Sequence, residues 1–282
     1  MRDKNRGLGV HMTYSERAAL AGLLADQDVA LHDPRVASAP NRQGLRQRTG
    51  ALLEAAFLDL CEALAPHLSV EIGAHEASFS ERLKGRLPEL SAIAFEANPL
   101  VHAAHAERLR AIGVDYRHCA ITRRAGPVEL HVPVSLLGTA LDRVSEIGSL
   151  ARRTLEVFEY EAFTAPGAAL DEVVACGAGE RAVAWVDAEG AQKEVVDGGQ
   201  TFFGQVLALY VELEREVVWR DQLCDREIEA ELAKYALAPA LRDNLASGQY
   251  NAVFVRDAPG VLAQALPVAD RYAADLRRLL DA

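Results

Sequence analysis

Short apolar runs alternate with amphipathic stretches over most of the chain from residue 68 onward. The runs predict strands at residues 68–73, 91–98, 114–121, 182–190, 206–214 and 250–256. Between most of these runs, helical spacing predicts helices at residues 76–87, 99–112, 190–203 and 225–236. Because strands that alternate with helices of this length are typical of βαβ units, we predict an α/β protein with a mostly parallel sheet.

The N-terminal part has a different pattern. Residues 13–31 and 50–65 carry apolar side chains at helical spacing, and the stretch 32–49 between them, rich in Pro, Gly and Arg, predicts a loop. We therefore expect a helical extension or lid over residues 1–65, followed by the main domain over residues 66–282.

Three further segments interrupt or end the alternation. Residues 134–170 predict a mixed insertion, preceded by an alternating stretch at residues 128–132 that suggests an extra strand. Residues 237–256 predict a terminal hairpin that turns at Ser247-Gly248, and residues 271–280 predict a short closing helix.

Composition narrows the classes of function. The chain of 282 residues has a net charge of −11, which argues against a general nucleic-acid binder. No apolar run approaches the roughly 20 residues of a membrane span, and the N-terminus lacks the apolar region of a secretory signal. We therefore expect a cytoplasmic protein whose four separate cysteines are reduced.

The first two predicted strands end in residues suited to a nucleoside. Gly73 and Ala74 follow the first strand and leave the backbone accessible, although His75 and Ser78 stand where a dinucleotide fingerprint would have glycine. Glu96 ends the second strand, where a carboxylate can accept both hydrogen bonds of a ribose diol. The structural alternatives are an ordinary turn at Gly73 and a helix-capping role for Glu96.

The strand over residues 182–190 ends in two carboxylates, Asp187 and Glu189. At the carboxyl end of a parallel strand these side chains face the ligand crevice, where they can orient an acceptor, take a proton or hold a divalent cation. Capping of the following helix would account for one of the two carboxylates.

Five segments follow one another along residues 66–256, namely GAH, FEANP, LDE, VDAEGAQ and YNAVFV. On these segments, residues 66–256 resemble the FkbM family of S-adenosylmethionine-dependent methyltransferases. The sequence departs from the family pattern at several positions. Glu71 stands for Asp, His75 for Asn, Ala77 for Gly, Ala97 for Pro and Gln192 for Glu.

The resemblance implies a class I methyltransferase (Rossmann-like) fold, with a seven-stranded, mostly parallel sheet, helices on both faces and an antiparallel last hairpin. It implies S-adenosylmethionine as cofactor and transfer of a methyl group to a hydroxyl of a small molecule of saccharide, glycolipid or polyketide type. The cofactor-binding residues would be Glu71, Gly73 and Ala74 for methionine, Glu96 and Ala97 for ribose, and His118, Cys119 and Ala120 for adenine.

Asp187 is the first candidate for the base that takes the hydroxyl proton, followed by Glu189 and His75. Glu212 ends the next strand and, with Asp187, suggests a possible Mg²⁺ site. The helices before residue 65 suggest a possible homodimer.

Two alternatives stay open at this point. An NAD-dependent oxidoreductase would share the βαβ start and Glu96, but the missing glycines count against it. A catalytically inactive binding module on the same fold would explain the departures at Glu71, His75 and Ala77.

Overall fold

A computed structural model describes residues 5–32, 42–243 and 248–281. The main sheet has seven strands in the order β10-β11-β9-β8-β1-β2-β3. Their bounds are β1 Leu68–Ile72, β2 Ser91–Glu96, β3 Val114–His118, β8 Ala182–Val186, β9 Val206–Glu214, β10 Leu237–Arg242 and β11 Gln249–Arg256. The predicted seven-stranded α/β fold is confirmed, and the strand order is that of the class I methyltransferase fold.

The sheet has a switch point beside β1. The chain runs from β1 outward through β2 to β3, and then returns to β8 on the other side of β1. The pairs β1–β2, β2–β3 and β1–β8 are all parallel, and only β10 and β11 form an antiparallel pair among the registers described for this sheet. In such sheets ligands bind beyond the carboxyl ends of the strands at the switch point.

The chain forms two compact units. The larger one, which we call the core unit, holds Pro66–Val206 and Glu214–Glu231. The other, which we call the terminal unit, holds the chain up to Ala65, Leu207–Leu213 and the chain from Leu232 onward.

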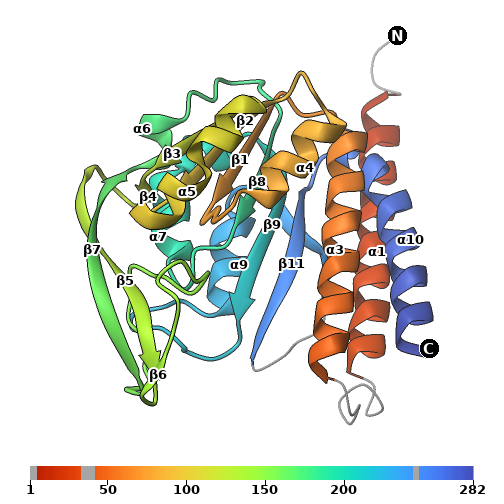
Figure 1. The fold of residues 1–282 in the computed structure, drawn as a ribbon. Coiled ribbons are helices and arrows are strands. Elements are labelled where there is room, and N and C mark those ends of the chain that lie inside the picture. Colours follow the sequence, from red (N-terminus) through yellow and green to blue (C-terminus); the bar gives the residue numbers. More distant parts are fainter. Residues whose placement is uncertain (1–4, 33–41, 244–247, 282) are drawn as a thin grey trace. The chain divides into compact units, whose positions relative to one another are not determined.

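The helices of the core unit follow its strands. Their bounds are α4 Ser78–Arg86, α5 Pro99–Ala111, α6 Leu170–Val173, α7 Gln192–Gly198, α8 Gln200–Phe203 and α9 Asp225–Ala233, of which the last two residues fall in the terminal unit. In Figure 1, α4 and α5 lie in front of β1, β2 and β3, while α7 is drawn behind the strands. Helices therefore cover both faces of the parallel strands, as expected for a doubly wound sheet.

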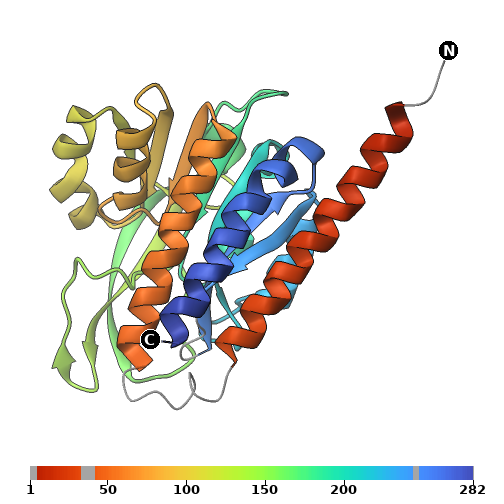
Figure 2. The same cartoon turned by 90° about the vertical axis from the view of Figure 1, so that its right-hand side faces the viewer.

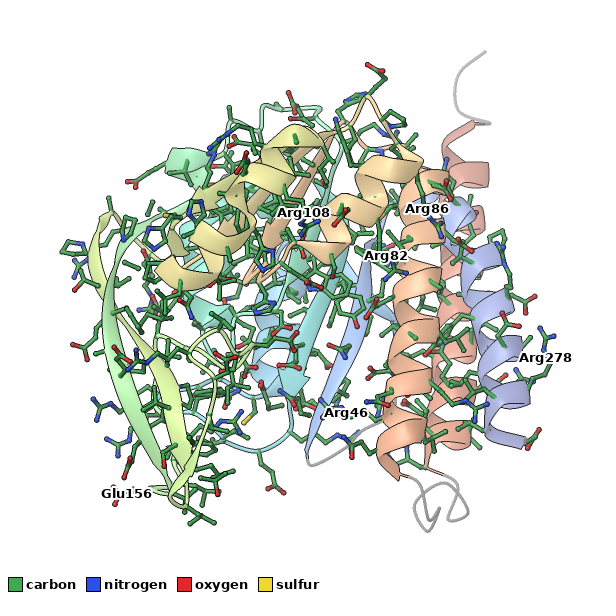
Figure 3. All side chains as sticks on the ribbon, in the orientation of Figure 1. Arg46, Arg82, Arg86, Arg108, Glu156 and Arg278 are labelled. Atoms are coloured by element: carbon green, nitrogen blue, oxygen red, sulfur yellow. The ribbon has the colours of Figure 1, made fainter. Side chains whose placement is uncertain are left out.

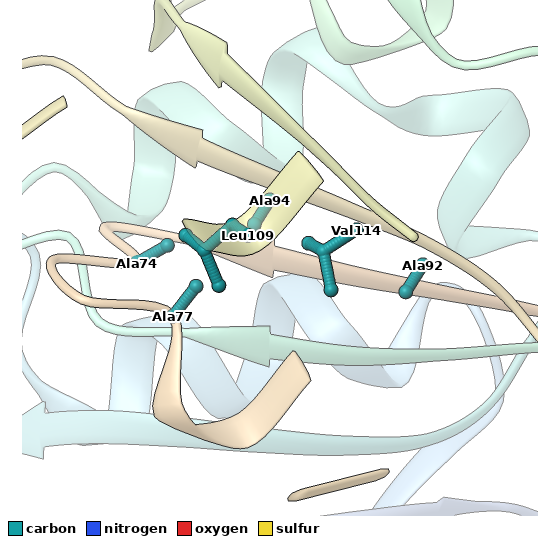
Figure 4. Packing of buried hydrophobic residues seen from close by; sticks show 6 residues of the cluster. All are labelled: Ala74, Ala77, Ala92, Ala94, Leu109 and Val114. Carbon is teal, nitrogen blue, oxygen red and sulfur yellow. The ribbon is translucent and has the colours of Figure 1, made fainter. Parts of the chain in front are cut away.

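Small side chains let α5 approach the sheet closely. Figure 4 shows this buried cluster, formed by Ala74, Ala77, Ala92, Ala94, Leu109 and Val114. Leu109 is the only large aliphatic residue that α5 adds to the cluster. It packs with alanines that belong to β2 and to the loop after β1. The packing of α5 therefore also fixes the backbone of that loop.

The insertion forms a second sheet within the core unit. Its order is β4-β7-β5-β6, with bounds β4 Ala120–Ile121, β5 Gly126–Leu136, β6 Thr139–Ala140 and β7 Phe158–Ala168. In this sheet β5 pairs antiparallel with β6 and β7, and β4 pairs parallel with β7. The predicted extra strand at residues 128–132 is part of β5, and the predicted insertion over residues 134–170 contains β7 as its return strand. The region in which the strand and helix patterns stopped alternating is therefore a long hairpin of β5 and β7.

The terminal unit contains three long helices, with bounds α1 Asn5–Leu31, α3 Arg42–Leu64 and α10 Pro259–Asp281. Figure 2 shows α10 between α1 and α3. Leu262, Tyr272 and Leu276 of α10 are buried, so this helix forms the apolar centre of the three.

Several boundaries differ from the sequence prediction. Residues 42–49, expected as loop, begin α3, and residues 33–41 and Ser247 lie outside the described residues. The closing helix begins at Pro259 rather than at residue 271. It continues through Pro267, although proline usually ends or kinks a helix. The helix expected over residues 190–203 is divided into α7 and α8 at Gly199. Among the described residues, no helix combines the length and the hydropathy that a bilayer-spanning segment requires.

Candidate functional site

A pocket lies at the carboxyl ends of β1, β2 and β8, at the switch point of the sheet, and we call it the switch-point pocket. All of its lining residues belong to the core unit. The lining includes nine residues singled out from the sequence, which are Glu71, Gly73, Ala74, His75, Glu96, Ala97, Cys119, Ala120 and Asp187. The fold brings these residues together, and their individual roles stay predictions.

The loop after β1 allows no side chain at Gly73. This residue has φ +72°, and a Cβ built on it would lie 1.7 Å from the carbonyl oxygen of Asp187. The loop then takes the left-handed conformation again at His75 (φ 46°) and Ala77 (φ 56°). These last two are the positions where the FkbM pattern has Asn and Gly, which adopt this conformation with less strain.

Contacts from α5 also hold the loop after β1. Arg108 of α5, labelled in Figure 3, forms an ion pair with Glu81 of α4. The same guanidinium donates a hydrogen bond of 2.8 Å to the carbonyl oxygen of Glu76. The loop is therefore fixed from outside the pocket as well as by the strand ends.

Glu96 offers a buried carboxylate whose two oxygens are both fixed by the main chain. The backbone N–H of His75 donates to Oε2 at 2.8 Å, and that of Asn98 donates to Oε1 at 2.6 Å. Burial raises the pKa of Glu96, and these hydrogen bonds oppose the rise. Because a carboxylate oxygen can accept more than one hydrogen bond, each oxygen can still accept from a ligand hydroxyl.

Glu71 is a buried residue of β1 whose side chain reaches the first turn of α4. Its Oε2 accepts a 2.8 Å hydrogen bond from the backbone N–H of Ser80. Burial raises the pKa of Glu71 to about 7, against the lowering effect of the hydrogen bonds from Ser80 and Phe79. Glu71 therefore both satisfies an N–H of the first turn of α4 and presents a carboxyl group to the pocket.

The segment 141–150 of the insertion closes one side of the pocket. The Nε2 atom of His75 lies 2.8 Å from the carbonyl oxygen of Val144. The side-chain amide of Asn98 donates to the carbonyl oxygen of Arg143 at 2.8 Å, while its oxygen accepts from Leu100 at the start of α5. His75 is thus engaged with the insertion, which makes it a less direct base candidate than Asp187.

Sequence reasoning missed this part of the lining, which consists of Ser145, Glu146, Gly148, Ser149 and Leu150, together with Asn98 and Leu130. Only Asn98 had a local signal, because Asn before Pro99 is typical of a helix N-cap. The others reach the pocket through the pairing of His131 with Ser149, which no local pattern predicts.

Asp187 and Glu189 differ in their surroundings. Asp187 lines the pocket, whereas Glu189 is not among its lining residues. Glu189 has φ 45° and its Oε2 lies 3.9 Å from the guanidinium of Arg153. Carboxylate oxygens of the two acids lie within 4.8 Å of each other, which is close enough for each charge to influence the other. The catalytic role expected for Glu189 stays a prediction.

An aromatic support holds the turn that carries these acids. The guanidinium of Arg153 lies 4.5 Å from the Trp219 ring and 5.4 Å from the Phe158 ring. Gly190 has φ +89°, and a Cβ there would lie 2.5 Å from Trp219. The Gly of the DAEG segment is therefore needed for close packing of Trp219 against the turn.

Two other residues predicted from the sequence, His118 and Glu212, are not part of the pocket lining. His118 is not among the lining residues, and its Nε2 lies 3.0 Å from the carbonyl oxygen of Ala97. Its neighbour Cys119 lines the pocket, and burial raises the pKa of its thiol. Glu212, the other predicted magnesium ligand, belongs to the terminal unit, and its joint role with Asp187 stays a prediction.

Comparison with known proteins gives no family assignment. No family model matches the chain. No curated protein sequence matches it either.

Solved structures with a similar arrangement exist at low identity. An O-methyltransferase family protein from Burkholderia thailandensis is 12% identical, with 89% of this chain and 70% of that chain covered and a TM-score of 0.40. The bifunctional kinase-methyltransferase WbdD is 14% identical, with 79% and 43% covered and a TM-score of 0.43. Ribosomal protein L11 methylase from Lactobacillus delbrueckii subsp. bulgaricus is 13% identical, with 74% and 79% covered and a TM-score of 0.38. The activities in these names belong to those proteins.

Proposed function

We propose that this protein is an S-adenosylmethionine-dependent O-methyltransferase of the FkbM type. The observation that carries the proposal is the buried Glu96 carboxylate, held by two backbone N–H groups at the end of β2 and facing the switch-point pocket. A carboxylate at this place in a doubly wound sheet suits the two hydroxyls of a ribose. The motif resemblance then selects the methyl donor among nucleoside ligands.

The loop after β1 supports a nucleoside without a pyrophosphate. His75 stands where a dinucleotide fingerprint has its second glycine, and its ring reaches the carbonyl oxygen of Val144. A pyrophosphate needs a bare backbone at this point. The same crowding therefore counts against an NAD-dependent oxidoreductase.

The residues of the pocket have separate tasks in this proposal. Glu96 holds the ribose, and Glu71 in its ionised form attracts the methionine ammonium. Asp187 orients the acceptor hydroxyl and accepts its proton. Positioning alone can supply about 7–11 kcal/mol of a barrier, and a base adds about 10²–10⁴-fold.

S-adenosylmethionine, when bound, would supply an activated methyl group on a sulfonium. Formation of the new C–O bond would be matched by breakage of the C–S bond, whose electron pair would stay on sulfur. The hydroxyl proton moves to Asp187, so the products are a methyl ether, a neutral thioether and a protonated carboxyl group.

Calorimetric titration tests the proposal directly. We expect S-adenosylhomocysteine to bind the full chain with 1:1 stoichiometry, and NAD to give no heat above that of buffer. NAD binding without S-adenosylhomocysteine binding would overturn the proposal. A screen of saccharides, glycolipids and polyketides with a labelled methyl donor then identifies the acceptor, and labelling of none of them would favour an inactive binding module.

A further inference from the structure

A second hollow lies in the core unit beside the switch-point pocket, with a cavity volume of about 1040 Å³. This is enough for a small molecule, since ligand pockets hold about 300–1,000 Å³. We call it the basic groove, because its lining includes Arg123, Arg124, Arg152, Arg220 and His131. Three acids also line it, namely Glu129, Glu194 and Asp221.

Two of the four arginines are already paired. Arg123 lies 3.1 Å from Glu194 and 3.0 Å from Asp197. Arg220 lies 3.3 Å from Glu156, which Figure 3 labels near the tip of the β5–β7 hairpin. These pairs fix two walls of the groove and leave little of their charge for a ligand.

The other two arginines keep their charge for a ligand. Within the described part of the chain, neither Arg124 nor Arg152 has a carboxylate within ion-pair distance, and both are exposed. The Arg152 guanidinium lies 5.7 Å from the centre of the Tyr160 ring, which restricts its orientation.

His131 adds a hydrogen-bonding group to the lining of the groove. Burial and the nearby charge of Arg152 lower the pKa of its imidazole, while Glu129, 3.4 Å from Nδ1, raises it. Because the net direction is downward, the ring is neutral near pH 7 and contributes a hydrogen bond rather than a third charge.

The groove adjoins the pocket in which the methyl group would be transferred. Leu150 and Ala191 line both hollows. Asp187 lies four residues before Ala191, on the pocket side of the same turn. A molecule that occupies the groove can therefore extend a hydroxyl past these two residues toward Asp187.

We propose that the basic groove binds an oxyanion group of the methyl acceptor, a phosphate or a carboxylate, through Arg124 and Arg152. The planar guanidinium matches two oxygens of either group at once. This inference rests on the proposed methyl transfer and narrows its acceptor to an anionic hydroxylated molecule, such as a phosphorylated or acidic saccharide.

Inorganic phosphate is the probe that tests the groove without a known acceptor. We expect saturable binding to the full chain in calorimetry at low ionic strength. The double variant R124Q/R152Q should bind phosphate at least about tenfold more weakly, since two charge-assisted contacts are lost. The control R110Q/R226Q removes the same charge from exposed sites outside both hollows and should bind within about twofold of the wild type.

Three outcomes would overturn the inference. They are no phosphate binding up to tens of millimolar, equal weakening in both double variants, and turnover of neutral acceptors at the rate of their phosphorylated forms. S-adenosylhomocysteine affinity is measured in the same variants and should not change. Absence of that affinity in the wild type would instead overturn the proposed function and leave the phosphate result standing.

Discussion

The switch-point pocket and the basic groove are neighbours, but different parts of the chain determine their chemistry. In the pocket, main-chain groups set the geometry. Two backbone N–H groups hold the Glu96 carboxylate, and the carbonyl oxygen of Asp187 lies close to Gly73. In the groove, exposed arginine side chains provide the chemistry, supported by ion pairs and an aromatic ring. The pocket should therefore tolerate little change, and the groove should tolerate much.

The largest expected effect comes from Gly73→Ala. The added methyl would overlap the Asp187 carbonyl oxygen at 1.7 Å, and φ +72° adds strain for any L side chain. We expect a loss of at least about 3 kcal/mol in the free energy of unfolding and no measurable S-adenosylhomocysteine binding. Urea unfolding and calorimetry measure both.

Gly85→Ala is the matched control, because a Cβ at this helical position meets nothing within 4 Å. It should be neutral or stabilising by up to about 1 kcal/mol. Normal binding by the Gly73→Ala variant would contradict the main-chain account of the pocket.

Asp187→Asn should lower kcat by about 10²–10⁴-fold, in line with loss of a general base. The S-adenosylhomocysteine and phosphate affinities should stay within about twofold, since neither ligand depends on this carboxylate for its charge. A labelled-methyl assay with the acceptor found by screening measures kcat. An undiminished kcat would move the chemistry elsewhere, and loss of activity on addition of EDTA to the wild type would indicate a metal route instead.

Glu71 should make stability depend on pH. Its pKa is about 7 in the folded chain and near 4.5 in the unfolded chain, so the folded state binds more protons between these values. The free energy of unfolding should therefore fall as the pH rises from about 4.5 to 7, by at most about 3 kcal/mol from this group. Affinity for S-adenosylhomocysteine should rise as the pH passes through about 7, where the carboxyl group of the folded chain ionises.

Glu71→Gln provides the comparison, because it removes the titration and keeps an oxygen for the Ser80 N–H. Asp243, whose pKa burial raises to about 6, contributes a slope of the same sign. The difference between the wild type and the variant isolates Glu71. Identical pH profiles of unfolding would contradict the raised pKa of the buried Glu71.

Glu96→Gln should weaken S-adenosylhomocysteine binding about tenfold or more, a change of roughly 1.4 kcal/mol, because the charged acceptor of the ribose hydroxyls is lost. Calorimetry of a folded variant measures this change. Arg124→Gln, on the groove side, should leave the same affinity unchanged. Equal effects of the two substitutions would erase the distinction between the two hollows.

The smallest expected effect is that of Asn98→Ser. Serine can still accept from the Leu100 N–H and cap α5, but it cannot donate to the Arg143 carbonyl oxygen. We expect faster amide hydrogen exchange in residues 141–150 and a loss of only a few-fold in S-adenosylhomocysteine affinity. Unchanged exchange in this segment would show that Asn98 does not tether it.

The sequence predicted those parts of the molecule that local patterns determine. The buried strands β1, β8 and β9 consist mostly of apolar residues, which made the parallel sheet predictable. Glu96 and Asp187 could be found because each lies at the end of such a strand. The left-handed positions of His75 and Ala77 explain why family-typical Asn and Gly occur there, although the residues themselves gave no such signal.

Non-local pairing determined the parts that the sequence did not predict. The segment 141–150 reaches the pocket because β5 and β7 pair across more than twenty residues and His131 pairs with Ser149. The groove depends in the same way on Arg220, which is far from Arg124 along the chain. Charged side chains scattered over a sequence carry no periodic signal, so only the structure brings them together.

The two ends of the inserted sheet meet at one place in the fold. Ala120 and Ile121 pair with Gly167 and Ala168, and the N–H of Thr122 donates to the carbonyl oxygen of Ala168 at 2.9 Å. The chain thus leaves the parallel sheet and returns to it through adjoining residues. Because closing a longer loop costs free energy only slowly with its length, the segment between these residues behaves as an exchangeable cassette. Exchange of this segment would therefore change two things at once, the groove arginines Arg124 and Arg152 and the wall that residues 141–150 give to the switch-point pocket.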